Sequence, residues 1–137
     1  MGRILAIDYG TKRTGIAVSD PMQIIASPLE TIPTQQLRDF ISSYISAEDV
    51  DAVVVGMPKK LNNEATDSTQ HVVGLIRSLR KQLSIPIEAV DERFTSKIAL
   101  DAMIRGGASK KDRREKGNID KVSAALILQT YLEKRTI

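Results

Sequence analysis

Short apolar runs alternate with longer amphipathic segments along the chain. Runs at residues 3–9 and 14–19 are rich in aliphatic and β-branched side chains, and the glycine-flanked hexad at residues 10–15 predicts a tight turn between them. A third extended segment, residues 24–32, contains Pro28, which favours an edge position in a sheet. The sequence therefore predicts three strands in an antiparallel meander.

The middle of the chain alternates strands with helices. Apolar residues at spacings of three and four predict helices over residues 34–47 and 69–83, and short apolar runs at 50–55 and 86–90 predict buried strands. Such alternation implies right-handed crossovers, a parallel half of the sheet and helices that cover its faces. We therefore expect an α/β fold.

The remainder of the chain predicts two helices separated by a charged loop. Thr95 is a suitable N-cap for a helix over residues 96–104, and Asn118 is a suitable N-cap for a last helix that ends near residue 134. The loop between them, residues 106–117, is the only linker-like stretch.

Length and composition favour one compact domain over residues 1–137. The chain has no cysteine, which excludes a disulfide scaffold or a thiolate metal site and fits a reducing compartment. No apolar run approaches the roughly 20 residues that span a bilayer, and the first residues lack the architecture of a signal peptide. We expect a cytoplasmic protein with no membrane association.

The positive charge of the chain is concentrated in one segment. The formal net charge is +3, yet residues 105–121 hold seven basic residues against three acidic ones. A basic patch on a near-neutral body is typical of a protein that binds a polyanion such as nucleic acid. The alternative is a solvated loop of mixed charge.

Asp8 directly follows the first predicted strand. If that strand is extended, Ile4, Ala6 and Asp8 share one face, so the carboxylate lies above a small residue. Carboxylate oxygens at such a place suit a hard divalent cation. The alternative is that Asp8 caps the turn by accepting hydrogen bonds from backbone amides.

Three more carboxylates are candidates for the same site. Asp91 and Glu92 follow another strand, and ligands in open α/β sheets gather at the carboxyl ends of the strands. Adjacent residues of a strand point to opposite faces, so one of the two is expected to coordinate, and periodicity alone leaves open which. The other reading is that they pair with Arg93.

Asp120 lies on the apolar face of the last predicted helix, in line with Ala124 and Leu128, so it should point toward the sheet. Inward carboxylates near one another repel unless cations compensate, which favours metal ions. The alternative for Asp120 is a favourable interaction with the N-terminus of its own helix.

The chain contains four ordered motifs: Asp8-x-Gly10-x-Lys12-Arg13-x-Gly15-x-Ala17-x-Ser19-Asp20, Gly56-x-Pro58, Asp91-Glu92-Arg93-Phe94-Thr95 and Asp120-x-x-x-Ala124-Ala125-x-x-Leu128-Gln129-x-Tyr131-Leu132. With these motifs the chain resembles the YqgF (RuvX) family of Holliday junction resolvases over nearly its whole length.

This resemblance implies a three-layer RNase H-like fold of the RuvC type, with a five-stranded mixed sheet and helices on both faces. It also implies a nuclease that processes the 5′ end of the precursor of 16S ribosomal RNA in ribosome biogenesis, with Holliday junction resolution in DNA recombination and repair as the alternative. The acidic residues that the resemblance carries over are Asp8, Glu92 and Asp120, so Glu92 is preferred to Asp91.

The resulting hypothesis is two-metal hydrolysis of a phosphodiester, in which Asp8, Glu92 and Asp120 hold Mg²⁺ or Mn²⁺. Basic residues would neutralise the phosphates, four of them near the site and four farther out. The near group is Lys12, Arg13, Lys59 and Lys60, and the far group is Lys110, Lys111, Arg113 and Arg114. With five aromatic residues in the chain, we expect recognition of backbone and shape in structured RNA or branched DNA rather than base stacking.

Two other classes of protein compete with the nuclease. The Asp-x-Gly-Thr segment also resembles the phosphate-binding segment of actin-like and sugar-kinase ATPases, but those enzymes clamp nucleotide between two domains and this chain has room for one. A non-catalytic nucleic-acid-binding module would keep the fold and cleave nothing. The sequence leaves a monomer and a homodimer both open, and His71 is taken as a surface residue.

Overall fold

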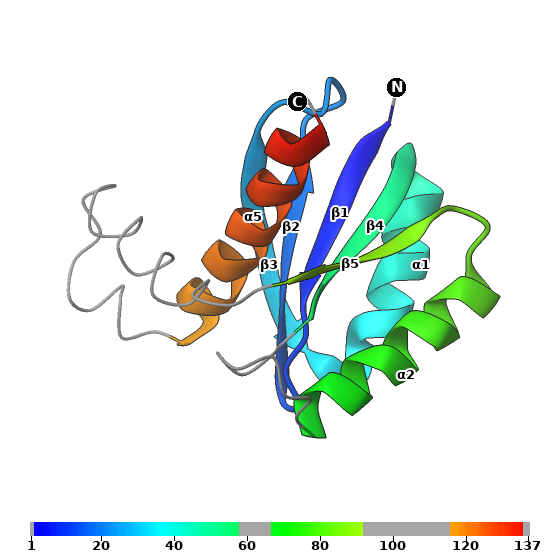
Figure 1. The fold of residues 1–137 in the computed structure, drawn as a ribbon. Coiled ribbons are helices and arrows are strands. Elements are labelled where there is room, and N and C mark those ends of the chain that lie inside the picture. The colour runs from blue at the N-terminus through cyan, green and yellow to red at the C-terminus, as the bar shows by residue number, and fades with distance from the viewer. Residues whose placement is uncertain (1, 58–66, 92–115, 136–137) are drawn as a thin grey trace.

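A five-stranded sheet organises the part of the chain that the structure, a computed structural model, describes: residues 2–57, 67–91 and 116–135 (Figure 1). The strands are β1 (Arg3–Asp8), β2 (Arg13–Ser19), β3 (Ala26–Pro33), β4 (Val50–Met57) and β5 (Ile87–Asp91). The helices are η1 (Thr34–Gln36), α1 (Leu37–Ala47), α2 (Asp67–Gln82) and α5 (Lys116–Arg135).

The sheet is mixed, with strand order β3-β2-β1-β4-β5. β1 pairs antiparallel with β2 and β2 with β3, whereas β1 pairs parallel with β4 and β4 with β5. The predicted meander and the predicted parallel half are both confirmed. β3 is an edge strand, as expected from Pro28, and its pairing with β2 shifts register at Leu29, because Ile16 pairs with Glu30 and Ala17 with Pro28.

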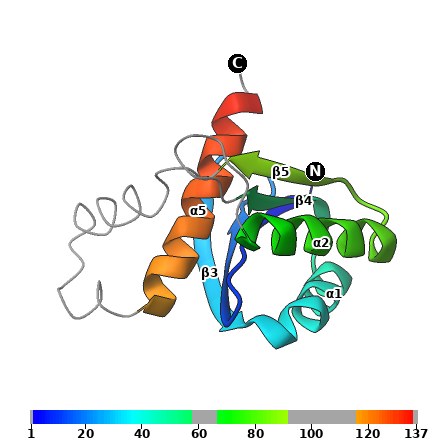
Figure 2. The same cartoon turned by 60° about the horizontal axis from the view of Figure 1, so that its bottom comes forward.

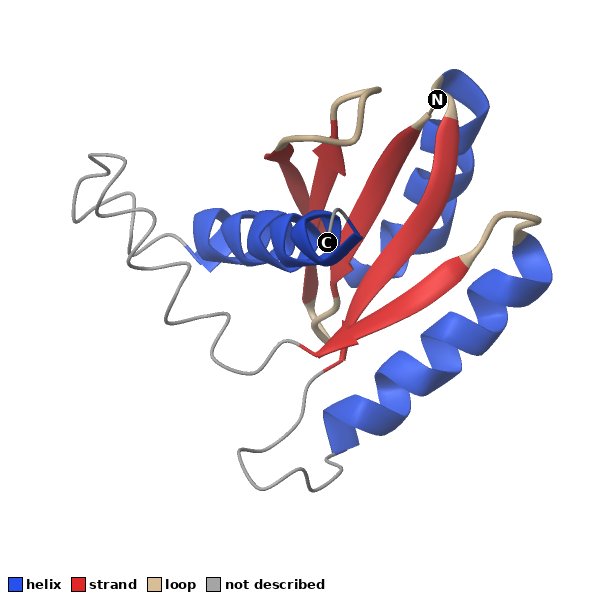
Figure 3. Ribbon diagram, turned by 45° about the horizontal axis from the view of Figure 1, so that its top comes forward, coloured by secondary structure: helices blue, strands red, loops and turns tan. Residues whose placement is uncertain are grey.

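The helices cover both faces of the sheet, as predicted. In Figure 2, α1 and α2 lie on one face and α5 on the other. The alternation of side chains along β1 explains this division: Leu5 and Ile7 pack with buried residues of α1 and α2, whereas Ile4 and Ala6 pack with α5. Figure 3 shows α5 crossing the sheet on its own side.

Element boundaries differ from the predicted ones by a few residues. The helix expected at residues 34–47 begins as the 3₁₀ turn η1 before α1, and the strand expected at 50–55 continues through Gly56 to Met57. The predicted helix at 96–104 and the linker at 106–117 lie outside the described residues.

None of the helices in the described ranges is both long enough and apolar enough to span a membrane.

The two faces of the sheet differ in side-chain size. The cluster between α1, α2 and the sheet is built mainly from leucine, isoleucine and valine. Beneath α5, by contrast, Ala6 pairs with Ala17 across β1 and β2, and the helix contributes Ala124 and Ala125. Small side chains on both surfaces let α5 lie close to the sheet.

This close packing gives a test of the fold. Ala124 is fully buried against the sheet, so Ala124→Leu should force α5 outward and lower the free energy of unfolding by about 1–3 kcal/mol. The matched control is Ala47→Leu at an exposed position, which should change the free energy of unfolding by less than about 0.5 kcal/mol. Equal effects of the two variants in urea unfolding would contradict the close approach of α5.

Candidate active site

Asp8 is the last residue of β1 and belongs to the α5 side of the sheet. Ile4 and Ala6, which lie on the same face of β1 as Asp8, are buried in the cluster under α5. Asp8 itself is half-buried. The alternation predicted for this strand is therefore confirmed. A half-buried carboxylate at a strand end keeps some contact with solvent and can still be reached by a ligand.

Glycines occupy the positions beside Asp8 on both neighbouring strands. On β2, Asp8 pairs with Gly15. On β4, the last pair in register is Ile7 with Val55, so the next residue along is Gly56. Both glycines are buried, and neither places a side chain beside the carboxylate. From the sequence, Gly15 was predicted only to flank the turn and Gly56 only to belong to a motif; their place beside Asp8 depends on strand pairing.

The carboxyl ends of β4 and β5 lie at the same edge of the sheet as Asp8. Gly56 pairs with Val90 and Met57 with Asp91, so the backbone of Asp91 ends β5 one position beyond Val90. Glu88 and Val90 face α5: Val90 packs in its cluster and the Tyr131 hydroxyl donates a hydrogen bond to the Glu88 carboxylate. Glu92 lies outside the described residues.

Position 120 lies in the first turns of α5, which run at the same edge. The C-terminal half of the helix contacts the opposite edge, where the Ala26 amide donates a hydrogen bond of 3.1 Å to Gln129 Oε1. The helix runs antiparallel to β1, so its N-terminal turns lie toward the carboxyl end of β1 (Figure 1). Asp120 precedes the buried residues Ala124 and Leu128 by one and two turns of the helix.

The turn after Asp8 presents two cations. Lys12 and Arg13 are both exposed, where β1 passes into β2. Glycine is required at Gly10, because a Cβ atom there would collide with the backbone carbonyl oxygen of Arg13. The structure thus places Asp8, Lys12 and Arg13 within one connection between two strands.

The other predicted cations lie outside the described residues: Lys59, Lys60, Lys110, Lys111, Arg113 and Arg114. Within the ranges that the structure describes, no group of three histidine, cysteine, aspartate or glutamate side chains is placed to hold a metal ion.

Asp20, the second aspartate of the first motif, lies at the opposite edge of the sheet and organises a loop there. Its Oδ1 accepts hydrogen bonds of 2.8 Å from the amides of Ile24 and Ile25, and its Oδ2 accepts one of 3.1 Å from Met22. These bonds, led by those from Ile25 and Ile24, lower the pKa of Asp20 below its ordinary value of 3.8. The residue is a structural cap.

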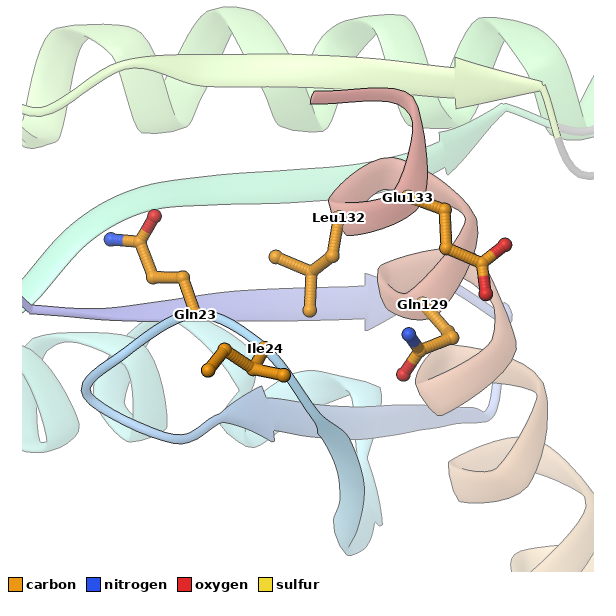
Figure 4. Close-up of a pocket in the computed structure, with 5 residues that line it drawn as sticks. All are labelled: Gln23, Ile24, Gln129, Leu132 and Glu133. Carbon is orange, nitrogen blue, oxygen red and sulfur yellow. The ribbon is translucent and has the colours of Figure 1, made fainter. Parts of the chain in front are cut away.

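A cavity at this opposite edge contains none of the predicted site residues. It is lined by Gln23, Ile24, Gln129, Leu132 and Glu133, which come from the loop after β2 and from the C-terminal half of α5 (Figure 4). Gln23 is buried, and its amide donates to the carbonyl of Gly2 at 2.7 Å and to Asp51 Oδ2 at 2.8 Å. These bonds tie the loop to the start of β1 and to β4.

Comparison with known families and relatives gives a consistent match. The family model described as "RuvX: Holliday junction resolvase" matches residues 2–134. A protein of Bacteroides fragilis is 51% identical over 138 residues, covering 100% of both chains, and one of Phocaeicola vulgatus is 52% identical over 136 residues, covering 98% of each. Both relatives are named "Putative pre-16S rRNA nuclease".

Solved structures share the fold. The Fowlpox virus resolvase in complex with Holliday junction DNA aligns with a TM-score of 0.64 at 11% identity, covering 98% of this chain and 99% of that chain. Thermus thermophilus RuvC in complex with a Holliday junction substrate aligns with a TM-score of 0.60 at 18% identity, covering 98% and 95%. The predicted RuvC-type, RNase H-like fold is confirmed.

The cap at Asp20 gives a pH-dependent prediction. Because folding lowers the pKa of Asp20, its stabilising contribution is complete above the ordinary value of 3.8 and is lost as the pH falls through the folded value. Asp20→Asn should therefore melt at a lower temperature than the unsubstituted protein at pH 7, and the difference should shrink below about pH 3.8. Thermal melts from pH 7 to pH 2, with exposed Asp39→Asn as the control, measure it. A difference that is constant with pH would contradict this role.

Proposed function

The chain belongs to the RuvX family, and from that premise we propose that it is a nuclease that hydrolyses phosphodiester bonds in structured nucleic acid. One observation carries the proposal: Asp8 ends a buried strand between two glycines and is followed directly by a turn with Lys12 and Arg13 exposed. A half-buried carboxylate with two exposed cations in the following turn suits a site for a metal ion and a phosphate.

We propose the 5′ end of the precursor of 16S ribosomal RNA as the substrate. Support comes from relatives about half identical to this chain over nearly all of both lengths, whose names refer to this precursor. Resolution of a four-way DNA junction is the second candidate, and the description of the matching family favours it. The two candidates share the chemistry of cleavage and differ in the nucleic acid that must fit around the site.

The proposed metal ligands are Asp8, Glu92 and Asp120, with Asp91 as the alternate to Glu92. The donors fit Mg²⁺ or Mn²⁺, because all are carboxylates and Asp8 is half-buried with no side chain on either flank. Glu92 is preferred to Asp91 because the resemblance of the motif Asp91-Glu92-Arg93-Phe94-Thr95 to the family carries over Glu92 as the acidic residue of the site. When bound, two such ions would activate a water molecule and stabilise the charge on the leaving oxygen.

The protein's own groups would place the substrate. Lys12 and Arg13 would contact the phosphates beside the scissile bond, and Lys59 and Lys60 the adjacent ones. Lys110, Lys111, Arg113 and Arg114 would hold the nucleic acid farther from the site. Because hydrolysis by activated water needs no side-chain nucleophile, the residues of the site serve to bind, orient and neutralise.

The first test is the variant Asp8→Asn, which keeps the size of the side chain and removes its charge. Cleavage should fall by about 100-fold or more, which corresponds to about 3 kcal/mol of lost transition-state stabilisation. Binding of Mn²⁺, followed by electron paramagnetic resonance, should weaken in parallel. The matched control is Asp39→Asn on α1, which should change neither quantity.

Cleavage that persists undiminished in Asp8→Asn would overturn the proposed site. Absence of cleavage of any substrate by the unsubstituted protein, together with retained binding, would instead favour a non-catalytic nucleic-acid-binding module.

The second test compares substrates. An RNA carrying the 5′ end of the 16S precursor and a four-way DNA junction are each incubated with the protein and Mg²⁺ or Mn²⁺, and kcat/KM is measured for both. We expect the RNA to be cleaved at least about tenfold more efficiently, a preference of about 1.4 kcal/mol. If the junction is instead cleaved about tenfold more efficiently than the RNA, resolution of DNA junctions replaces RNA processing as the proposed function.

A further inference from the structure

A threonine from a distant element holds the turn that carries the two cations. Thr34, the first residue of η1, donates its backbone amide to the carbonyl of Lys12 at 3.0 Å. Its hydroxyl donates to the carbonyl of Gly10, and it also lies 2.9 Å from the hydroxyl of Thr14. One residue therefore satisfies the carbonyl groups on both sides of Thr11.

The direction of each hydroxyl bond follows from a count of hydrogens. A threonine hydroxyl has one hydrogen, and that of Thr34 is directed at the carbonyl of Gly10. The Thr14 hydroxyl must therefore donate to Thr34 Oγ1. Thr14 is fully buried, so water does not compete for this bond. The hydroxyls form an ordered chain from the sheet to the turn.

Thr34 lies between two ordered elements, the end of β3 and the start of α1. Immediately before it, Pro33 pairs with Arg13 and Ile32 with Thr14, so the end of β3 is fixed beside the turn. Shortly after it, α1 begins at Leu37, whose side chain is buried in the core. Thr34 is thus placed by a paired strand on one side and a packed helix on the other.

We propose that Thr34 is a positioning residue that fixes the turn over residues 10–13, so that Lys12 and Arg13 are already oriented when phosphate arrives. This inference rests on the proposed function, because it takes phosphate as the partner of the two cations. Lysine and arginine side chains on a loose turn would be ordered only at binding, and that ordering would weaken affinity. A turn that hydrogen bonds from Thr34 already hold loses less conformational entropy when phosphate binds.

The experiment is a double-mutant cycle read by binding. Affinities for a fluorescein-labelled four-way DNA junction and for the 16S precursor RNA are measured by anisotropy without divalent metal, so that no strand is cut. Thr34→Val removes the hydroxyl and keeps the shape, and it should weaken binding about 3- to 10-fold, as expected for the loss of one or two hydrogen bonds. Thr34→Ser, which restores the hydroxyl, should bind within about twofold of the unsubstituted protein.

The decisive comparison is the effect of Thr34→Val in a protein that already carries Lys12→Ala and Arg13→Ala. If Thr34 acts through these cations, its effect on affinity should vanish there. The salt dependence should agree, with a shallower slope of log affinity against log salt in Thr34→Val, because each lost phosphate contact reduces the slope by about 0.7–0.9.

An effect of Thr34→Val that persists in the Lys12→Ala, Arg13→Ala background would overturn the proposal, since Thr34 would then act independently of the cations. Unchanged affinity in Thr34→Val, or in the Lys12→Ala, Arg13→Ala variant, would also overturn it. If Thr34→Val fails to fold, Thr14→Val replaces it in the cycle, because it removes only the buried hydroxyl that donates to Thr34.

The outcome is separable from that of the proposed function, which is read by cleavage in Asp8→Asn. If the protein cuts no substrate, the mutant cycle can still be non-additive and so support the role of Thr34. If cleavage depends on Asp8, the cycle can still be additive and so contradict that role.

Discussion

The parallel pairing of β1 with β4 and of β4 with β5 is the constraint on which the candidate site depends. Parallel strands bring their carboxyl ends to one edge, so Asp8, Gly56 and Asp91 lie at the same edge on three consecutive strands although they are far apart in the chain. The antiparallel partner β2 adds Gly15 on the other flank of Asp8 and returns the chain through the turn with its two cations. A slip of one residue in the β1–β2 or the β1–β4 pair would move Asp8 to the other face or replace a flanking glycine with a side chain.

The two faces of the sheet carry different kinds of side chain. Large aliphatic residues pack beneath α1 and α2, with Leu5, Ile7 and Leu79 fully buried. Beneath α5 the contacts include Ala6, Ala17 and the alanines of the helix, which bury less apolar area per residue but bring the helix near the sheet. The face with Asp8 therefore carries more small side chains than the face beneath α1 and α2.

Much of the fold could be predicted because its signals are local. Strand periodicity identified the meander, helical periodicity identified α1 and α2, and Pro28 marked the edge strand. Asp8 could be assigned to a face of β1 because alternation within a strand needs no knowledge of its partners. Asp120 was a candidate because helical periodicity puts it on the apolar face of its helix, whereas the choice of Glu92 over Asp91 depended on the family resemblance. The described side chains include neither Glu92 nor Asp120, so their roles stay predictions.

The parts that could not be predicted depend on contacts between segments that are distant in sequence. Thr34 was expected only to open a helix, since no local pattern shows that its hydroxyl meets the carbonyl of Gly10. Asp20 belongs to the same motif as Asp8, yet three backbone amides of its own loop occupy its two oxygens at the other edge of the sheet. Residue type therefore does not separate a structural carboxylate from a candidate ligand. Both residues stand at the carboxyl end of a strand, but β1 and β2 are antiparallel and the two residues therefore lie at opposite edges of the sheet. Asp8 shares its edge with the carboxyl ends of β4 and β5 and with the first turns of α5.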